Sequence, residues 1–242
     1  MQYMLIHTLD ENLQLDEEEV AEDRSSLATW LEEVIPLGVD LHGSRLRPTT
    51  DATTVRVRNG ELLVTDGPFA ETKEQVAGYD VLECSTLEEA VGWASKHPTA
   101  RIGAIEVRPL AEGPPVRLVT EPTGRTMRYM LLICVDRSVP LQPQEIAGIG
   151  PATEAWVAEM DGRGIRIFGN ELEAVDHART VRAAADQVLV TDGPFAETKE
   201  QIAGFDIIDC TDLDEAIEVA AKHPVARFGA IEVRPFWPLP WT

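Results

Sequence analysis

The sequence predicts an α+β protein that contains two copies of one small domain. The string at residues 65–75, Thr-Asp-Gly-Pro-Phe-Ala-Glu-Thr-Lys-Glu-Gln, returns unchanged at residues 191–201. Other matches keep the same offset, among them a Lys-His-Pro triplet at 96–98 and again at 222–224. The offset between the copies is 126 residues (191 minus 65). Each copy is therefore the size of a small domain, and the repeat is too long for a solenoid. The chain of 242 residues is therefore a tandem duplication.

Hydrophobic periodicity and turn residues predict the elements of the first copy. Apolar residues within 27–34 have the spacing of one helix face, and Asn59-Gly60 between extended runs is typical of a type I′ hairpin. Thr86, three residues before a glutamate, predicts a helix N-cap. The expected order is a strand at 2–9, a helix that begins at the acidic run 16–19 and ends at Pro36, strands at 39–46, 53–58, 61–65 and 76–83, a helix from Thr86 to His97, and a strand at 102–107.

Each copy thus has the order β-α-β, hairpin, β-α-β, which predicts a ferredoxin-like fold with its helices on one sheet face. The bare sheet faces of the two copies would pack together as a pseudo-dimer with approximate two-fold symmetry. The predicted domains are 1–110 and 127–242, joined by a proline-containing linker at 111–126. The tail at 236–242, rich in tryptophan and proline, is expected to lie in an apolar groove of its own molecule or of a neighbouring one.

Composition excludes several classes of partner. A net charge of −21 would repel nucleic acid and anionic membrane surfaces. The sequence contains no apolar run long enough for a membrane span and no signal peptide, and it predicts a cytoplasmic protein. Cys84, Cys134 and Cys210 lack metal-site spacing and indicate reduced thiols. Because no nucleotide-binding fingerprint or metal-spaced histidine cluster occurs, neither a cofactor nor a metal is expected.

The repeated string carries a family resemblance. Asp-Gly-Pro-Phe at 66–69 and 192–195, each with a later Glu-Val-Arg-Pro, resembles the DGPF, or YCII-related, family over nearly the whole chain. The resemblance implies ferredoxin-like units that pair as a dimeric α+β barrel with a cleft between them. It also implies a His-Asp pair as a proposed enzymatic site, although neither first helix here contains a histidine. Some relatives are encoded beside sigma factors of the extracytoplasmic-function type.

Three residues are the candidate catalytic groups. Asp66 and Asp192 each follow a strand and precede Gly-Pro, which would aim a carboxylate rigidly as a general base or as a ligand for a cation. The structural alternative is that each aspartate bonds the amides of its own turn. His42 is the candidate acid or base of an asymmetric site, since the second copy has Phe168 at that position.

Ligand binding is assigned to other residues of the two strings. Lys73 and Lys199 could hold an anionic group, and Phe69 and Phe195 complete the expected binding set. Salt bridges across the pseudo-two-fold axis would explain the repeated charges without a ligand. The repeated histidines at 97 and 223 are interpreted as positively charged caps of helix C-termini.

These observations favour a protein that binds a small molecule in a cleft between the two repeats. Whether it is also an enzyme, with the motif aspartates as acid and base, stays open. The alternative is a non-enzymatic interaction module, for example a regulator of an extracytoplasmic-function sigma factor, in which the acidic surface engages a basic protein partner. Association beyond the intramolecular pseudo-dimer is not predicted either way.

Overall fold

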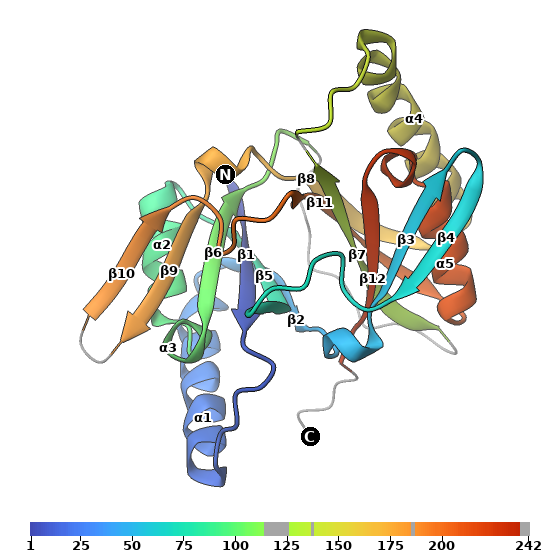
Figure 1. The fold of residues 1–242 in the computed structure, drawn as a ribbon. Helices are drawn as coiled ribbons and strands as arrows, with labels where there is room; N and C mark the ends of the chain where they lie inside the picture. Colours follow the sequence, from blue (N-terminus) through green and yellow to red (C-terminus); the bar gives the residue numbers. More distant parts are fainter. Residues whose placement is uncertain (114–125, 137, 185–186, 238–242) are drawn as a thin grey trace. The chain divides into compact units, whose positions relative to one another are not determined.

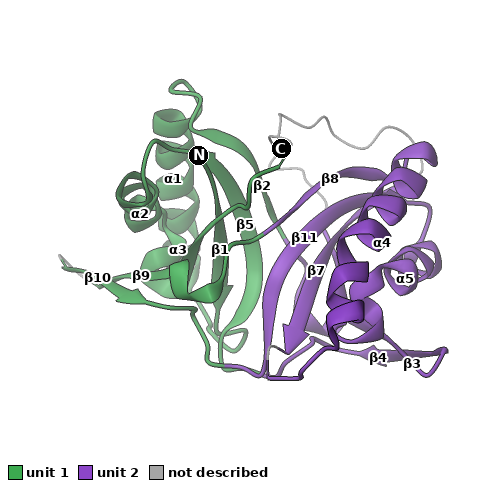
Figure 2. Ribbon diagram, turned by 90° about the horizontal axis from the view of Figure 1, so that it is seen from above, with its two compact units in different colours: residues 1–45, 72–118, 172–197 green, residues 46–71, 119–171, 198–242 purple. Residues whose placement is uncertain are grey.

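The computed structural model describes residues 1–113, 126–136, 138–184 and 187–237, which contain two six-stranded antiparallel sheets (Figure 1). The chain divides into two compact units, each built around one sheet (Figure 2). Unit 1 comprises residues 1–45, 72–118 and 172–197, and unit 2 comprises residues 46–71, 119–171 and 198–242. Each unit therefore contains segments of both sequence repeats.

Unit 1 has the strand order β10-β9-β6-β1-β5-β2. Its strands are β1 (Gln2–Leu9), β2 (Asp40–Arg45), β5 (Gln75–Glu83), β6 (Ala104–Pro109), β9 (Arg179–Ala184) and β10 (Gln187–Asp192). Its helices are α1 (Glu17–Val34), α2 (Leu87–Lys96), α3 (Thr99–Ile102) and the 3-10 helix η2 (Val175–His177). The central order β6-β1-β5-β2, with helices in the crossovers, confirms the predicted ferredoxin-like arrangement.

Unit 2 has the strand order β4-β3-β12-β7-β11-β8. Its strands are β3 (Thr53–Arg58), β4 (Glu61–Asp66), β7 (Met127–Asp136), β8 (Arg166–Glu171), β11 (Glu200–Cys210) and β12 (Ala230–Pro235). Its helices are α4 (Pro143–Gly162) and α5 (Leu213–Lys222), with the 3-10 helices η1 (Thr49–Asp51) and η3 (Pro224–Arg227). The second repeat therefore builds the same central sheet as the first.

A hydrophobic core lies between the helices and the sheet of each unit. In unit 1, Trp30 and Val34 of α1 pack with Leu5 and Val107 of the sheet, and all four are buried. Burial of each such side chain contributes about 1.5–3 kcal/mol. Trp156, the repeat-equivalent of Trp30, has the same role in unit 2. The tryptophans shared by the two first helices are thus core residues.

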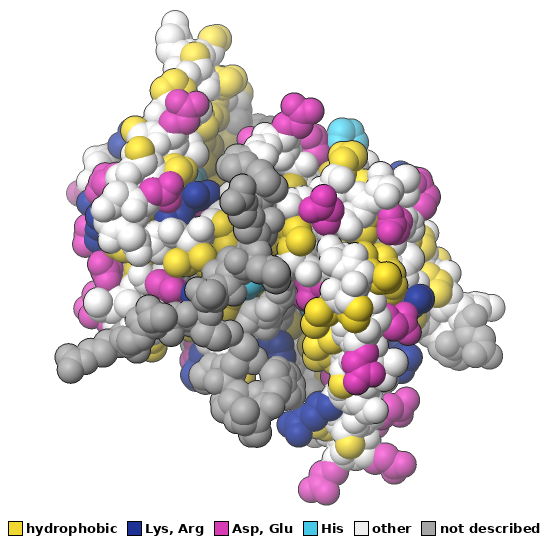
Figure 3. All heavy atoms as spheres, turned by 180° about the vertical axis from the view of Figure 1, so that it is seen from behind, with side chains coloured by type: hydrophobic (Ala, Val, Ile, Leu, Met, Phe, Trp, Pro, Cys, Tyr) yellow, Lys and Arg dark blue, Asp and Glu magenta, His cyan; other side chains and the backbone are white. Residues whose placement is uncertain are grey.

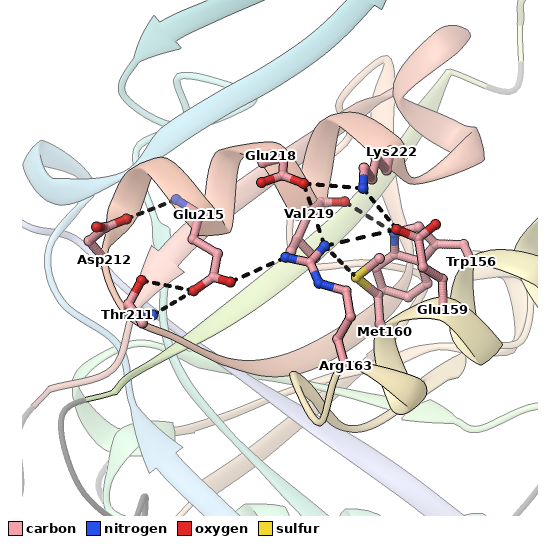
Figure 4. Close-up of polar contacts among 10 residues, drawn as sticks. All are labelled: Trp156, Glu159, Met160, Arg163, Thr211, Asp212, Glu215, Glu218, Val219 and Lys222. Carbon is pink, nitrogen blue, oxygen red and sulfur yellow. Dashed lines mark hydrogen bonds and ion pairs between the residues drawn. The ribbon is translucent and has the colours of Figure 1, made fainter.

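Polar contacts also join the two helices of unit 2 (Figure 4). The indole Nε1 of Trp156 in α4 donates to the Val219 carbonyl of α5 at 3.1 Å. Beyond the end of α4, Arg163 lies 3.2 Å from the carboxylate of Glu215. Exposed ion pairs contribute only about 0–1 kcal/mol, so the buried indole bond is the stronger link between these helices.

Each sheet is completed by a hairpin from the other repeat. The β3–β4 hairpin of the first repeat pairs with β12, with Thr54 opposite Glu232. The β9–β10 hairpin of the second repeat pairs with β6 in the same way. The predicted type I′ turn is confirmed, because Asn59 and Gly60 have φ angles of 54° and 81°. Nothing in the hairpin's own residues indicates which sheet it joins.

The predicted elements agree with the structure with one exception. The strand expected at 102–107 begins at Ala104, because residues 99–102 form α3. Of the predicted linker, residues 114–125 lie outside the described residues, as do residues 238–242 of the tail. The described part of the tail includes Trp237, which is 41% exposed and lies 5.7 Å from the guanidinium of Arg47. Packing of the tail in a groove stays a prediction.

The surface agrees with the acidic composition. On the face shown in Figure 3, acidic side chains lie scattered among hydrophobic and neutral ones. Among the described helices, none combines the length and the apolar character needed to cross a bilayer.

Candidate functional site

Hydrogen bonds from the repeated string hold each exchanged hairpin on the sheet that the hairpin joins. Gly67 has a φ angle of 97°, which only glycine adopts readily. Its amide donates to the Ala52 carbonyl, and its carbonyl accepts from Thr54 Oγ1 at 2.8 Å. Two residues later, the Phe69 amide donates to Glu232 Oε2 at 2.9 Å. The first half of the string thus ties a first-repeat hairpin to a strand of the second repeat.

The second string makes the same contacts in unit 1. The Phe195 amide donates to Glu106 Oε2 at 3.1 Å, and Gly193 has a φ angle of 93°. Glu106 is buried and paired with the guanidinium of Arg108, just as Glu232 is paired in unit 2. The repeated Glu-Val-Arg-Pro sequence therefore supplies the acceptor that holds the string. These contacts support a structural role for Asp-Gly-Pro-Phe.

The candidate residues of the strings lie at the surface or act through their backbone. Asp66 and Asp192 are exposed, and Asp192 lies 3.1 Å from Arg179. Lys73 and Lys199 are exposed as well. Phe69 and Phe195 are half-buried and bond through their amides. A catalytic or ligand-binding role for these residues stays a prediction.

His42 lies on the edge strand β2 beside a tyrosine. Its Nδ1 is 2.7 Å from the hydroxyl of Tyr79, and the two rings stack with centroids 5.7 Å apart. The imidazole is half-buried. This position leaves His42 next to, but outside, a more deeply buried group of ionisable side chains in unit 1.

That buried group is centred on Asp80, in the middle of β5. Asp80 Oδ2 is 2.9 Å from His7 Nε2 of β1 and 3.7 Å from His97 Nε2, just after α2. Asp80 and both histidines are buried. A Cβ at Gly43 would lie 1.8 Å from Asp80 Oδ1, so glycine makes room for the carboxylate. His7, Asp80, His97 and the nearby Asp40 are called the acid–base centre below.

The tautomer of His97 decides which ligands this centre could hold. Asp80 and the two histidines offer atoms within 4.8 Å of one another, as metal ligands would. However, His97 Nδ1 accepts a hydrogen bond from the Thr99 amide at 3.2 Å. Nε2 of a neutral ring then carries the proton and has no lone pair for a metal. The arrangement suits proton transfer better than a three-ligand metal site.

Burial raises the pKa of both carboxyl groups in the acid–base centre, and repulsion by Asp80 adds to the shift of Asp40. Desolvation raises the pKa of Asp80 to about 6. Desolvation and then repulsion by Asp80 raise the pKa of Asp40 to about 7. Desolvation lowers the pKa of His7 and His97 to about 3. His7 and Asp80 are close enough for an ion pair, but burial favours their neutral forms. The carboxyl groups therefore exchange protons near neutral pH.

His97 and His223 are the C-cap residues of α2 and α5, as predicted, but the expectation that they carry a positive charge is wrong. Both side chains are buried. Desolvation lowers the pKa of His223 to about 4, so it is neutral like His97. Each Nδ1 accepts a hydrogen bond from the backbone amide two residues further along the chain, that of Thr99 or Val225. The rings thus join the helix end to the core and do not interact with the helix dipole as cations.

Unit 2 has a different set of side chains at the equivalent positions. Asp206 corresponds to Asp80, and a Cβ at Gly169 would meet its carboxylate just as in unit 1. Ile133 replaces His7, and Arg166 replaces Asp40. Arg166 Nε donates to Asp206 Oδ1 at 2.6 Å. Desolvation raises the pKa of Asp206 to about 6, while Arg166 opposes that shift. The carboxylate of unit 2 is thus ion-paired.

A cavity of about 700 Å³ lies beside Asp206 in unit 2. It is bordered by residues of α4, β7, β8, β11 and η3. Most of its wall is apolar, and its polar groups include Arg166, Asp206 and His223. Nε2 of His223 is buried and has no hydrogen-bond partner within the described part of the chain. Neither motif aspartate borders this cavity.

Sequence reasoning missed the acid–base centre although a signal was present. Asp80 and Asp206 are charged residues with apolar neighbours on both sides in their strands, and they occur at the same position of both copies. Strand alternation also places His7 on the same face as the core residues Tyr3 and Leu5. A repeated acid on the inner face of a strand indicates a buried carboxylate that requires partners.

Comparisons with known proteins place the chain in a family but do not assign an activity. The model of the YCII-related domain matches residues 1–113 and 127–240. Uncharacterized protein R00369 of Rhizobium meliloti (strain 1021) is 50% identical over 70 residues, which are 28% of this chain and 56% of that protein. The crystal structure of putative chlorite dismutase TA0507 aligns with 98% of this chain and 94% of its own, at 9% identity and a TM-score of 0.46. The chain thus spans little more than half the length of the curated relative.

Proposed function

The chain belongs to the YCII-related family, whose model matches both repeats, and we propose that it binds a small molecule and transfers a proton at the acid–base centre of unit 1. The observation that carries this proposal is the position of Asp80, whose Oδ2 faces His7 Nε2 at 2.9 Å and His97 Nε2 at 3.7 Å. A buried carboxyl among such partners is typical of functional sites.

The chemistry follows from the protonation states of the two carboxyl groups. Burial raises the pKa of Asp80 and of Asp40 toward neutrality, so each is available as acid or base at the pH of a cell. Asp40 is only half-buried, and it would exchange protons between solvent and Asp80. His97, a neutral ring with its proton on Nε2, would stabilise negative charge on Asp80 after a proton is accepted by the ligand.

The sequence-based proposal places the acid and base differently, at Asp66 and Asp192 in a cleft between the repeats. That cleft depends on the relative placement of the two units, and it stays a prediction. The two proposals differ in which carboxylates are required, so one set of variants separates them. The matched variant for Asp80→Asn is Asp206→Asn, its repeat-equivalent in unit 2.

Deuterium incorporation tests for proton transfer without knowledge of the net reaction. A metabolite library is incubated with the protein in D₂O, and exchange into each compound is followed by mass spectrometry. We expect the wild-type protein and Asp206→Asn to catalyse exchange on one compound class, and Asp80→Asn to lose it by a factor of about 10² or more. Exchange that survives in Asp80→Asn but disappears in an Asp66→Asn/Asp192→Asn variant would instead support the motif aspartates.

A further inference from the structure

The unit 2 cavity is large enough for an organic ligand and has the walls of a binding site. Its volume of about 700 Å³ falls within the range of roughly 300–1,000 Å³ that is usual for small-molecule pockets. Ile133, Val157 and Phe228 contribute apolar surface to it. Val139 and Ile146, which also border the cavity, are 49% and 58% exposed. A ligand with a hydrocarbon body would remove this apolar surface from water.

A buried polar atom at the cavity has no hydrogen-bond partner in the part of the chain that the structure describes. His223 is 2% exposed, and its Nδ1 accepts a hydrogen bond from the Val225 amide at 3.3 Å. Nε2 therefore carries the proton, and it has no acceptor among the described residues. An unsatisfied buried donor costs about 1–3 kcal/mol. An acceptor oxygen on a ligand would satisfy it.

The charges around the cavity indicate a ligand without a negative charge. Arg166 is already engaged by Asp206 at 2.6 Å and lies 3.7 Å from Asp161. Asp136 and Glu171 also border the cavity, and a net charge of −21 disfavours anions further. A carboxylate or phosphate would meet repulsion here, whereas a neutral oxygen would not.

We infer that unit 2 has a second binding site, which takes a neutral, largely hydrocarbon molecule and bonds its carbonyl oxygen to Nε2–H of His223. This site is separate from the acid–base centre, because the cavity lies in unit 2 and the acid–base centre lies in unit 1. Where unit 1 has His7 and Asp40, unit 2 has Ile133 and Arg166. Ile133 gives the cavity an apolar surface where unit 1 has the His7 imidazole, and the guanidinium of Arg166 forms an ion pair with Asp206.

A fluorescent naphthyl ketone and the naphthyl hydrocarbon of the same shape test the site. Ala203 borders the cavity, and Ala77 is its repeat-equivalent in unit 1, so Ala203→Phe and Ala77→Phe form a matched pair. We expect saturable binding of the ketone to the full chain, a loss of at least tenfold in affinity in Ala203→Phe, and unchanged affinity in Ala77→Phe. Equal affinity in all three proteins would overturn the proposal.

A second variant tests the hydrogen bond. His223→Phe keeps an aromatic ring beside Trp156, whose ring lies 4.7 Å from that of the histidine. We expect this variant to weaken the affinity for the ketone about tenfold and to leave the affinity for the hydrocarbon unchanged. Only the ketone has an oxygen that accepts a hydrogen bond from Nε2–H. Equal losses for both probes would refute the role of Nε2, and circular dichroism melting shows whether each variant is folded. Asp80→Asn should leave binding of both probes unchanged.

Discussion

The same four positions of the two repeats carry two different sites. In unit 1 they are His7, Asp40, Asp80 and His97, which form a buried acid–base centre. In unit 2 the equivalent residues are Ile133, Arg166, Asp206 and His223, which border an apolar cavity. The backbone around them is shared, because Gly43 and Gly169 make room for the two aspartates in the same way. The two aspartates thus have equivalent backbone surroundings, while the side chains at the other positions differ.

Burial raises the pKa of Asp80 and of Asp206 alike, to about 6, but the charged neighbours of the two carboxylates differ. Asp80 has a second carboxylate, Asp40, nearby, and repulsion between the two favours protonation. Asp206 has a guanidinium 2.6 Å away, which stabilises its charged form. In unit 2, Nε2 of His223 has no hydrogen-bond partner among the described residues. Two exchanges distinguish the sites, because Ile133 stands in place of His7 and Arg166 in place of Asp40.

The largest effect is expected when the ion pair of unit 2 is broken. Arg166→Met leaves the buried Asp206 without its guanidinium, and we expect a loss of about 3–5 kcal/mol in the free energy of unfolding at pH 8. Urea denaturation measures it. The double variant Arg166→Met/Asp206→Leu should recover most of that loss, because no charge is left unpaired. A single variant as stable as wild type would show that the pair does not hold Asp206.

The next effect concerns a feature that the two units share. Glu106→Gln and Glu232→Gln each leave a buried arginine, Arg108 or Arg234, without its carboxylate. We expect each variant to lose about 3 kcal/mol of stability, with similar values in the two units because the contacts to the string are the same. A loss confined to one variant in urea denaturation would contradict the view that both strings are anchored alike.

A smaller effect, of opposite sign, is expected for Asp80→Asn. Its folded-state pKa is raised above the unfolded value, so stability falls as the pH rises from about 4, where Asp80 ionises in the unfolded chain, to about 6, where it ionises in the fold. Removing the charge should stabilise the protein by up to about 3 kcal/mol at pH 8 and by little below pH 4. Unfolding measured from pH 4 to 8 tests the sign. Destabilisation at pH 8 would mean that Asp80 forms a charged pair with His7.

The smallest effect concerns the turn of the string. Gly67→Ala and Gly193→Ala place a side chain at φ angles of 97° and 93°, which costs about 1 kcal/mol. Gly92 lies within α2 with nothing near its would-be Cβ, so Gly92→Ala should instead stabilise by about 0.5–1 kcal/mol. Thermal unfolding compares the three variants. A gain in the two turn variants would contradict a structural role for these glycines.

Much of the fold could be predicted because its signals are local. The Asn59-Gly60 turn, the Thr86 cap and the periodic helix faces depend on neighbours in the sequence. The hairpin exchange could not be predicted, since it depends on which sheet edge each hairpin meets. The anchoring of Phe69 by Glu232 joins residues of different repeats, and periodicity carries no information about such contacts.

The candidate site was harder to predict than the fold. The repeated string drew attention to Asp66 and Asp192, which are exposed, whereas Asp80 is an inward-facing charge within an apolar strand. The cavity depends on how α4 lies against β8 and β11, and spacing along the chain does not determine this. The Asp40-to-Arg166 exchange is visible in the sequence, but its consequence for the paired aspartate requires the structure.

Carboxyl ¹³C NMR titration tests the difference between the two sites most directly. In the wild-type chain we predict that Asp40 and Asp80 titrate with pKa values near 7 and 6. Asp80→Asn should lower the pKa of Asp40, and Asp206→Asn should change neither pKa. These results would show two coupled carboxyl groups confined to unit 1. A pKa near 4 for both aspartates, or an Asp40 pKa that does not respond to Asp80→Asn, would contradict the acid–base centre.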